Sequence, residues 1–282
     1  MTADAKATGQ PERAPIEALP LGDCGVVVTG GTSGVGLATA HALVKAGVRR
    51  IVLIGRNEER GLAARDAVRT GAAKNTGAGN GGTVIEFVAA DANIAERATW
   101  AAENAIRLLG SVDVLVNSTV GPFVPGLFHN MSIDDILPAI VQQVAAPLHM
   151  CRALLPGMRA RRTGSIINIA SDAAKVPTPG EAVIGGAMAA IVRFSNTLAM
   201  EAKRDGVRVN TVTPSLIGNT GSYDRVMGSE FSAKLFSKAV QAAHLGLVQP
   251  EDLAALIVFL AGPESARLTG QTISVNGGIS AA

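Results

Sequence analysis

Hydrophobic positions along this chain fall into short runs rich in Val and Ile, which alternate with longer segments whose apolar residues recur every three or four positions. The short runs predict buried strands and the longer segments predict helices. Repeated strand–helix units predict an α/β fold in one domain: a doubly wound parallel sheet of about seven strands with helices on both faces. The expected strands are 24–30, 49–56, 83–90, 111–117, 164–171, 207–214 and 271–278, and the expected helices are 34–47, 57–70, 94–109, 133–160, 181–204 and 251–262.

Three regions fall outside this alternation. Residues 1–22 have no apolar run and are expected to form a disordered N-terminal arm, which leaves 23–282 as the folded domain. Residues 71–82 consist mostly of Gly, Ala and Asn and are expected to be a flexible surface insertion. Residues 215–248 are expected to be a substrate loop with helical pieces. Within the long helix 133–160, Pro138 and Pro147 are expected to break or kink the helix.

Composition narrows the class of protein. Apolar residues make up 48% of the chain and aromatic residues only 3%, so the core must consist of Ala, Val, Leu and Ile. The net charge is +2 without any basic or acidic block, which argues against a nucleic-acid or membrane-surface partner. Cys24 and Cys151 give neither a disulfide framework nor a metal-ligand spacing, so we expect two buried thiols and no metal. No signal peptide or membrane-spanning segment is expected, which predicts a soluble cytoplasmic protein.

A glycine-rich turn lies between the first expected strand and the first expected helix. In TGGTSGVG (29–36), the glycines Gly30, Gly34 and Gly36 are spaced GxxxGxG. Glycines permit a tight turn and a close approach of backbone N–H groups to a diphosphate, and the helix N-terminus behind them adds partial positive charge. A turn that binds nothing is the alternative, but the position within the first strand–helix unit favours a dinucleotide.

Several ordered motifs resemble those of the short-chain dehydrogenase/reductase family. They are TGGTSGVG (29–36), Asp91 in VAADA, DVLVN (113–117), GSIINIAS (164–171), RVNTVTP (208–214) and LTGQTISVNGG (268–278). The resemblance runs from about Asp23 to the end and implies a Rossmann-type fold. It also implies cofactor-binding positions at Gly30, Thr32, Ser33, Gly34, Val35, Gly36, Arg56, Asp91, Ala92, Asn117 and Pro214.

The residue after the second strand indicates which cofactor is preferred. An acidic residue there would bond the ribose 2′-hydroxyl and repel a 2′-phosphate, whereas this chain has Gly55, Arg56 and Asn57. Arg56 offers a planar fork of donors to a phosphate, so we expect NADP(H) in preference to NAD(H). The alternative is that Arg56 is a solvated surface residue.

The family's catalytic residues are mostly absent. Members reduce a carbonyl with hydride from nicotinamide and a proton from a tyrosine, which a lysine four residues later activates; a serine holds the substrate oxygen and an asparagine anchors a water. Here the serine is kept as Ser171, but the tyrosine and lysine positions hold Ile184 and Met188, and the asparagine position falls on Gln143. A misalignment does not explain this, because the sequence on both sides stays in register.

Neighbouring segments depart from the family as well. The usual Pro-Gly after the sixth strand reads Pro214-Ser215, and the usual Asn-Asn-Ala-Gly reads Asn-Ser-Thr-Val at 117–120.

Other side chains near the site are weighed as replacements for the missing tyrosine. Tyr223, in the substrate loop, is the best unconventional acid. Glu181 is more simply an acid favoured by the helix dipole, Lys175 a surface charge, and His149 a structural residue, while Asp172 lies near the strand end. Lys234, Lys238 and His244 are either a solvated helix face or contacts for an acidic or CoA-linked substrate.

Three functions therefore remain open. The chain is an NADP(H)-dependent oxidoreductase that acts on a small carbonyl, alcohol or activated alkene through a non-standard site. Alternatively, it is an inactive subunit, a pseudoenzyme, that supports an intact relative. In the third hypothesis it is an NADP(H) sensor. The family resemblance implies tetramers built through helices 133–160 and 181–204, as a homo-oligomer or a hetero-oligomer with an intact subunit.

Overall fold

A computed structural model describes residues 18–76 and 83–282 of the chain. Its centre is a seven-stranded sheet in the order β3-β2-β1-β4-β5-β6-β7, in which every neighbouring pair is parallel. The strands are β1 (Gly25–Thr29), β2 (Arg50–Gly55), β3 (Val84–Ala89), β4 (Val114–Asn117), β5 (Gly164–Ile169), β6 (Val207–Pro214) and β7 (Thr272–Val275). The strand order reverses at β1 and β4, as expected for a doubly wound sheet.

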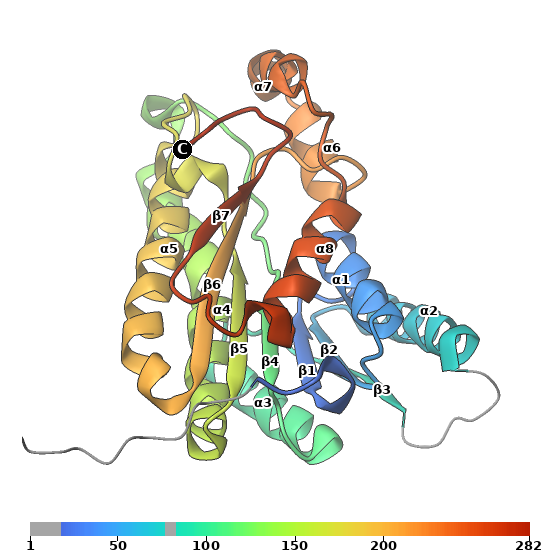
Figure 1. Ribbon diagram of the computed structural model, residues 1–282. Coiled ribbons are helices and arrows are strands. Elements are labelled where there is room, and N and C mark those ends of the chain that lie inside the picture. Colours follow the sequence, from blue (N-terminus) through green and yellow to red (C-terminus); the bar gives the residue numbers. More distant parts are fainter. Residues whose placement is uncertain (1–17, 77–82) are drawn as a thin grey trace, which may run out of the picture.

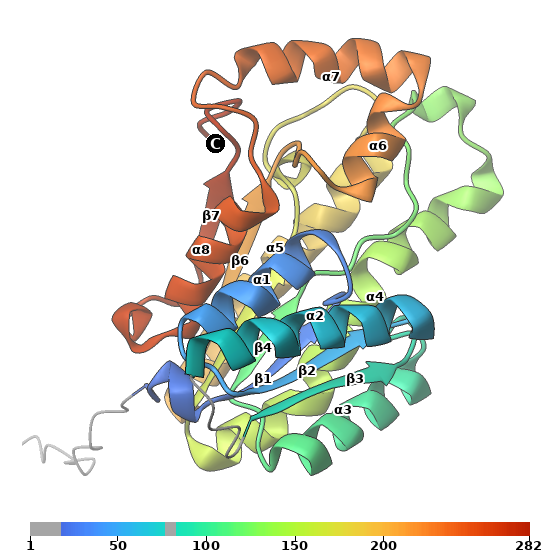
Figure 2. The same cartoon turned by 90° about the vertical axis from the view of Figure 1, so that its right-hand side faces the viewer.

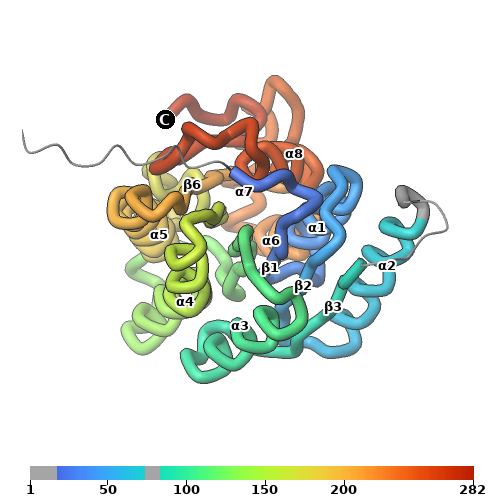
Figure 3. The backbone as a smooth tube through the Cα atoms, turned by 60° about the horizontal axis from the view of Figure 1, so that its bottom comes forward, coloured from blue at the N-terminus to red at the C-terminus, as the bar shows by residue number. Residues whose placement is uncertain are grey.

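The helices form a layer on each face of this sheet (Figure 1). They are α1 (Gly34–Lys45), α2 (Glu58–Thr76), α3 (Ala95–Leu109), α4 (Ile133–Arg161), α5 (Ala182–Ala202), α6 (Gly221–Met227), α7 (Glu230–Ala242) and α8 (Pro250–Ala261). In Figure 3, α3, α4 and α5 lie on one side of the sheet and α1, α2 and α8 on the other. The predicted α/β class, sheet type and helix layers are thus confirmed.

The core has the composition that the sequence predicts. Two clusters of buried side chains, one under each helix layer, consist mainly of Ala, Val, Leu and Ile. Val26, Val27 and Val28 of β1 are fully buried, because a central parallel strand is covered on both faces. Cys24 and Cys151 are buried free thiols, as expected, and burial raises the pKa of each to about 12.

The predicted element boundaries differ from the observed ones at α2 and at the N-terminal arm, whereas the helical pieces predicted within 215–248 are confirmed. Helix α2 continues to Thr76, so the start of the predicted 71–82 insertion is helical, and residues 77–82 lie outside the described residues. The alanines of 71–76 favour helix continuation, which outweighed the glycine. Of the predicted N-terminal arm, residues 1–17 lie outside the described part. Leu19 and Leu21, however, pack against the core, so the ordered chain begins before residue 23. The predicted loop 215–248 contains α6 and α7, which lie above β6 and β7 in Figure 2.

Helix α4 is continuous despite Pro138, Pro147 and Pro156, so the predicted break is wrong. Proline in a helix interior loses a hydrogen bond and clashes with the preceding turn. Here the helix packs between α3 and α5 and buries Pro147 with Met150 and Leu154. This burial offsets the local cost and keeps the two halves of the helix together.

Within the described residues, one helical stretch, Ala182–Asp205, is apolar and long enough to cross a membrane by length and composition alone. The core helix of a soluble protein meets the same criterion, so the expectation that no segment spans a membrane stays a prediction. The helix of this stretch, α5, packs against α4 and β6 and buries Ala187, Ile191 and Leu198, as a core helix of this fold does.

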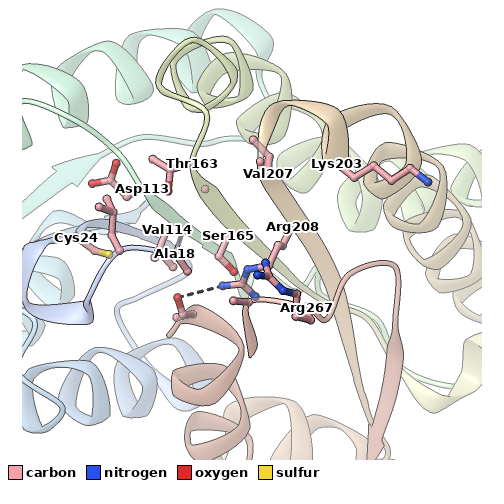
Figure 4. A pocket seen from close by; sticks show the side chains of 15 residues that line it. Ala18, Cys24, Asp113, Val114, Thr163, Ser165, Lys203, Val207, Arg208 and Arg267 are labelled. Carbon is pink, nitrogen blue, oxygen red and sulfur yellow. Dashed lines mark hydrogen bonds between the residues drawn. The ribbon is translucent and has the colours of Figure 1, made fainter. Parts of the chain in front are cut away.

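At the amino ends of the strands, Arg208 holds the end of α8. A cavity of about 260 Å³ lies there, and Figure 4 shows Arg208 among its lining residues. Arg208 Nη1 donates to the Leu260 carbonyl and to Ser265 Oγ, both at 2.8 Å. Its Nη2 donates to the Gly262 carbonyl at 3.2 Å and to the Ala261 carbonyl at 3.4 Å. Burial lowers the pKa of Arg208 to about 10, which leaves it charged at neutral pH. This arginine therefore satisfies the carbonyls at the end of α8.

We predict that Arg208→Met lowers the free energy of unfolding by about 2–4 kcal/mol, because buried carbonyls lose their charged donor. Urea denaturation measures this change. Arg204→Met is the matched control, since Arg204 is exposed on the turn before β6, and its effect should stay within about 0.5 kcal/mol. Equal stabilities of the two variants would contradict the assigned role.

Candidate functional site

A cavity of about 460 Å³ opens at the carboxyl ends of the strands. Because the strands are parallel and in register, Thr29 at the end of β1 pairs with Ile54 of β2 and with Asn117 of β4. The loops after these strands therefore meet at one edge of the sheet. Segments after β1 to β6, together with α5, α6, α7 and the C-terminal residues Ile279 and Ser280, line the cavity. This edge is where open parallel sheets bind ligands.

The turn between β1 and α1 has no room for side chains at two glycines. Gly30 has φ +76°, and a Cβ there would lie 2.3 Å from the Ser118 carbonyl oxygen; a Cβ at Gly36 would lie 2.3 Å from the Gly30 carbonyl oxygen. Gly34, also with positive φ, begins α1, and its N-cap Ser33 makes no side-chain cap hydrogen bond. The first N–H groups of α1 thus lack a side-chain cap and can receive an anion.

One buried polar atom beside this turn also lacks a partner. Thr29 Oγ1 makes no hydrogen bond within the described residues, and Thr29 lines the cavity. A buried hydroxyl without a partner is costly unless a ligand satisfies it. The tight turn, the N-terminus of α1 and this hydroxyl together fit the diphosphate and ribose of a dinucleotide.

Two arginines and one aspartate line the end of the cavity next to β2 and β3. Arg56 Nη1 lies 4.0 Å from Asp91 Oδ2, and the Asn93 N–H donates to Asp91 Oδ1 at 3.0 Å. Arg60, which the sequence does not single out, lies in the first turn of α2 and lines the same wall as Arg56, which precedes the helix. Its backbone N–H donates to Asn57 Oδ1 at 2.8 Å, which fixes the first turn of α2. No spacing rule in the sequence links the two arginines, because Arg56 lies outside the helix.

Most of the predicted cofactor positions line this cavity. They are Gly30, Thr32, Ser33, Gly34, Val35, Arg56, Asp91, Ala92 and Pro214. Gly36 does not line it but packs against Gly30, which closes the turn. His149 Nδ1 contacts the Ala92 carbonyl at 3.0 Å, in agreement with its expected structural role.

Asn117 differs from its expected position, because its side chain points into the protein rather than into the cavity. Its Nδ2 donates to Asn168 Oδ1 at 2.8 Å, and Asn168 Nδ2 donates to Ser195 Oγ at 2.8 Å. Asn117 is 2% exposed and Asn168 is fully buried. The chain of hydrogen bonds ties β4, β5 and α5 together, so the Asn117 side chain helps to position α5 and does not line the cavity.

The other end of the cavity contains the residues at the family's catalytic positions. Ser171, Ile184 and Met188 all line it. Ser171 Oγ accepts a hydrogen bond from the Ala173 N–H at 3.2 Å, in the short 3-10 turn η3 (Asp172–Ala174). Met188 is buried and packs with Ala170. An apolar wall therefore stands where the family has a phenol and an ammonium group.

Gln143 is not in the cavity, contrary to its expected role at the asparagine position. It is 2% exposed, and its Oε1 accepts a hydrogen bond from the Gly121 N–H at 3.0 Å. The adjacent residue, Gln142, lines the cavity instead. Gln143 holds the loop after β4 against α4, because its side chain is longer than that of asparagine and reaches the backbone of Gly121.

Lys175 is also not the surface charge that the sequence indicates. Its side chain is 17% exposed and donates to Ser274 Oγ and to the Ala282 carbonyl. Asp172, which is buried, accepts hydrogen bonds from Ser274, Asn276 and Ser280. This cluster ties η3 to the C-terminal segment, a long-range contact that sequence spacing does not reveal.

Glu181 is the N-cap residue of α5 but makes no side-chain cap hydrogen bond. Burial raises its pKa from the ordinary 4.5 to about 6, and a hydrogen bond with Thr178 acts in the opposite direction. The helix dipole is not among the causes of this shift, so its expected effect on Glu181 stays a prediction. Its carboxyl group lies in the wall of the cavity.

The substrate loop contributes apolar side chains and one phenol. Tyr223 of α6 lines the cavity, and α7 adds Leu235, Phe236 and Ala239. Lys234, Lys238 and His244 are exposed and do not line the cavity, so its wall gives no support to the hypothesis of a contact with an acidic or CoA-linked substrate. Their positions agree with the solvated helix face that the sequence favours.

The described residues contain no group of His, Cys, Asp and Glu that could hold a metal ion.

Comparisons with known proteins agree with this geometry. Residues 30–280 match the family model described as Enoyl-(Acyl carrier protein) reductase. The chain is 31% identical over 258 residues to 2-(S)-hydroxypropyl-CoM dehydrogenase 3 of Xanthobacter autotrophicus, covering 91% of this chain and 96% of that protein. It is 34% identical over 263 residues to 2,3-dihydroxy-2,3-dihydro-p-cumate dehydrogenase of Pseudomonas putida, covering 93% and 96%.

Among solved structures, a variant of actinorhodin polyketide ketoreductase with NADPH superposes with a TM-score of 0.81 at 26% identity, covering 93% of this chain and 99% of that one. The parallel sheet, the glycine turn at the carboxyl edge and these matches lead to one conclusion. The chain belongs to the short-chain dehydrogenase/reductase family, whose members are oxidoreductases that bind NAD(P)(H).

Proposed function

We propose that this chain binds NADP(H) and reduces a small activated alkene or a carbonyl by a site that lacks the family's tyrosine and lysine. The observation that carries the proposal is that one cavity joins an intact dinucleotide turn to Ser171 and an apolar wall at Ile184 and Met188. Bound nicotinamide would supply the hydride. The chain's own residues bind and orient the reactants and exclude water.

The cofactor's parts have matching groups along the cavity. The turn from Gly30 to Val35 fits the diphosphate, because its glycines admit close approach of the backbone. Asp91 fits the adenine by family resemblance. Arg56 and Arg60 fit a 2′-phosphate, since the residue directly after β2 is Arg56 and not an acidic side chain that would repel it.

An activated alkene suits the reaction end of the cavity better than a simple ketone. Family members hydrogen-bond a carbonyl oxygen with the tyrosine, and Ile184 offers no donor there. The apolar residues of α7 suit a hydrocarbon chain. The description of the matching family model names an enoyl reductase, which acts on a conjugated C=C bond. The first assay is therefore NADPH oxidation with 2-cyclohexenone and with cyclohexanone. Absence of turnover with either would count against this proposal.

A second candidate function is that of a supporting subunit. Ile133, Leu137 and Val141 follow each other at four-residue spacing on α4 and are 85%, 70% and 51% exposed. Apolar side chains in a row on one helix face favour contact with another subunit, and family resemblance implies tetramers through this helix. Co-expression with an intact relative tests this role: a stable mixed assembly whose activity needs both chains would favour a supporting subunit over an independent enzyme.

Binding of NADP(H) without turnover, by this chain alone or together with a relative, would favour a sensor.

We predict that Arg56→Ala raises the Kd for NADPH by roughly 10-fold and that Arg56→Ala with Arg60→Ala raises it by roughly 100-fold, because each guanidinium is expected to contribute about 1.4 kcal/mol toward the phosphate. The Kd for NADH should change by less than about 3-fold. Calorimetric titration gives both constants. Arg107→Ala, an exposed position on α3, is the control. Equal losses for NADPH and NADH would show that the arginines do not recognise the 2′-phosphate.

We predict that Ile184→Tyr with Met188→Lys gains carbonyl reductase activity of at least roughly 100-fold over the starting protein, because a general acid is restored beside Ser171. Reduction of cyclohexanone is the measurement. Adding Ser171→Ala should remove the gain. An inactive double variant that folds and binds NADPH would contradict the view that these two substitutions account for the loss.

A further inference from the structure

Four side chains that can exchange a proton line the described part of the cavity: Asp91, Asp172, Glu181 and Tyr223. The remaining ionisable residues there, Arg56, Arg60 and Arg225, stay protonated and cannot act as acids. Reduction of a C=C or C=O bond requires a proton in addition to the hydride. These four side chains are therefore the candidate proton sources of the cavity once the tyrosine is missing.

Two of the four are committed to other contacts. Asp91 lies beside Arg56 and the Asn93 N–H, at the adenosine end of the cavity. Asp172 accepts hydrogen bonds from Ser274, Asn276 and Ser280 and lies 3.7 Å from Lys175 Nζ. These hydrogen bonds commit the carboxyl group of Asp172 to holding the C-terminal segment in place.

Glu181 differs in both position and surroundings. Glu181 is the N-cap residue of α5, three positions before Ile184 and seven before Met188, and all three residues line the cavity with Ser171. Glu181 thus precedes the position of the missing phenol by about one helical turn and lines the same cavity. No ion pair holds it among the described residues, whereas the other two carboxyls have cationic neighbours.

The surroundings of Glu181 move its pKa toward neutral pH. Burial is the main cause of its raised pKa, which is about 6, and the hydrogen bond with Thr178 is the other, opposing cause. The other ionisable residues that line this cavity or the neighbouring one beside Gly180 are Arg56, Arg60, Asp91, Asp172, Tyr223, Arg225 and Asp135. None of them is among the causes of the shift. An acid whose pKa is near the operating pH transfers protons efficiently.

We propose that Glu181 takes the place of the missing tyrosine as the proton-donating residue of this cavity. The Glu181 O–H bond breaks as a new C–H or O–H bond forms at the substrate atom that carries the negative charge. The carboxylate left behind regains its proton from water, so protons balance over the cycle. The assignment rests on the proposed reductase function.

The first test is the titration of Glu181 in the cofactor-free protein. Carbon-13 NMR of protein labelled at glutamate carboxyls should show one signal that titrates near pH 6 and is missing in Glu181→Gln. Glu251→Gln, at an exposed acid of the first turn of α8, should retain that signal. Titration of Glu181 near the ordinary value of 4.5 would overturn the proposal.

Stability provides a second readout that needs no substrate. The folded-state pKa of Glu181 is raised, so the protonated carboxyl stabilises the fold below about pH 4.5 and that contribution is lost as the pH rises through about 6. Glutamine stays neutral. Urea denaturation should therefore show that the free energy of unfolding of Glu181→Gln rises relative to that of the starting protein between pH 4.5 and pH 6.5. Glu251→Gln should show no such rise. If Glu181→Gln shows no rise either, this result would count against Glu181 as the proton donor.

Activity separates this inference from the proposed function. In Glu181→Gln, turnover of 2-cyclohexenone should fall by roughly 100- to 10,000-fold while the Kd for NADPH changes by less than about 3-fold. Glu181→Asp should recover part of the activity. Unchanged turnover in Glu181→Gln would overturn the role of Glu181 and leave the proposed function intact. Absence of NADPH oxidation by the starting protein would overturn both.

Discussion

The site depends on how closely the backbone after β1 approaches its neighbours. Gly30 and Gly36 leave 2.3 Å between a hypothetical Cβ and a carbonyl oxygen, so no side chain fits at either position. This contact seats the N-terminus of α1 against the ends of β1 and β4. The uncapped amides of α1 and the unpartnered Thr29 hydroxyl lie beside this contact, at the mouth of the cavity. Together they form a surface that fits an anion.

The second determinant is the buried chain of hydrogen bonds from Asn117 through Asn168 to Ser195. It fixes α5 to the sheet from inside. As a result, the first turns of α5 present Glu181, Ile184 and Met188 to the cavity whether or not the family's tyrosine and lysine are present. The scaffold that positions a reacting group is therefore intact, and what differs is the chemistry of the side chains it positions. The carboxyl group of Glu181 can therefore take over the proton-donating role that the family assigns to a tyrosine.

The sequence was sufficient for the parts of the fold that depend on local patterns. Strands with uninterrupted Val and Ile and helices with regular apolar spacing were located to within a few residues, and the glycine turn was identified by its place between them. The continuity of α4 through its prolines was not predictable, because it depends on packing against α3 and α5. The extension of α2 to Thr76 and the packing of Leu19 and Leu21 are similar cases, in which context outweighed composition.

The sequence predicts which residues line the cavity where backbone position alone places them there, as at Ser171 and Arg56. It predicts them less well where the direction of the side chain decides. Asn117 and Gln143 point away from the cavity. Lys175 is held by residues about a hundred positions later, and the raised pKa of Glu181 arises from burial that no local pattern encodes.

The central claim is that this cavity is a working NADP(H) site despite the lost tyrosine. Calorimetric titration of the purified protein with NADPH and then NADH tests it most directly. The account predicts micromolar binding of NADPH and at least roughly 10-fold weaker binding of NADH; no detectable binding of either would contradict it.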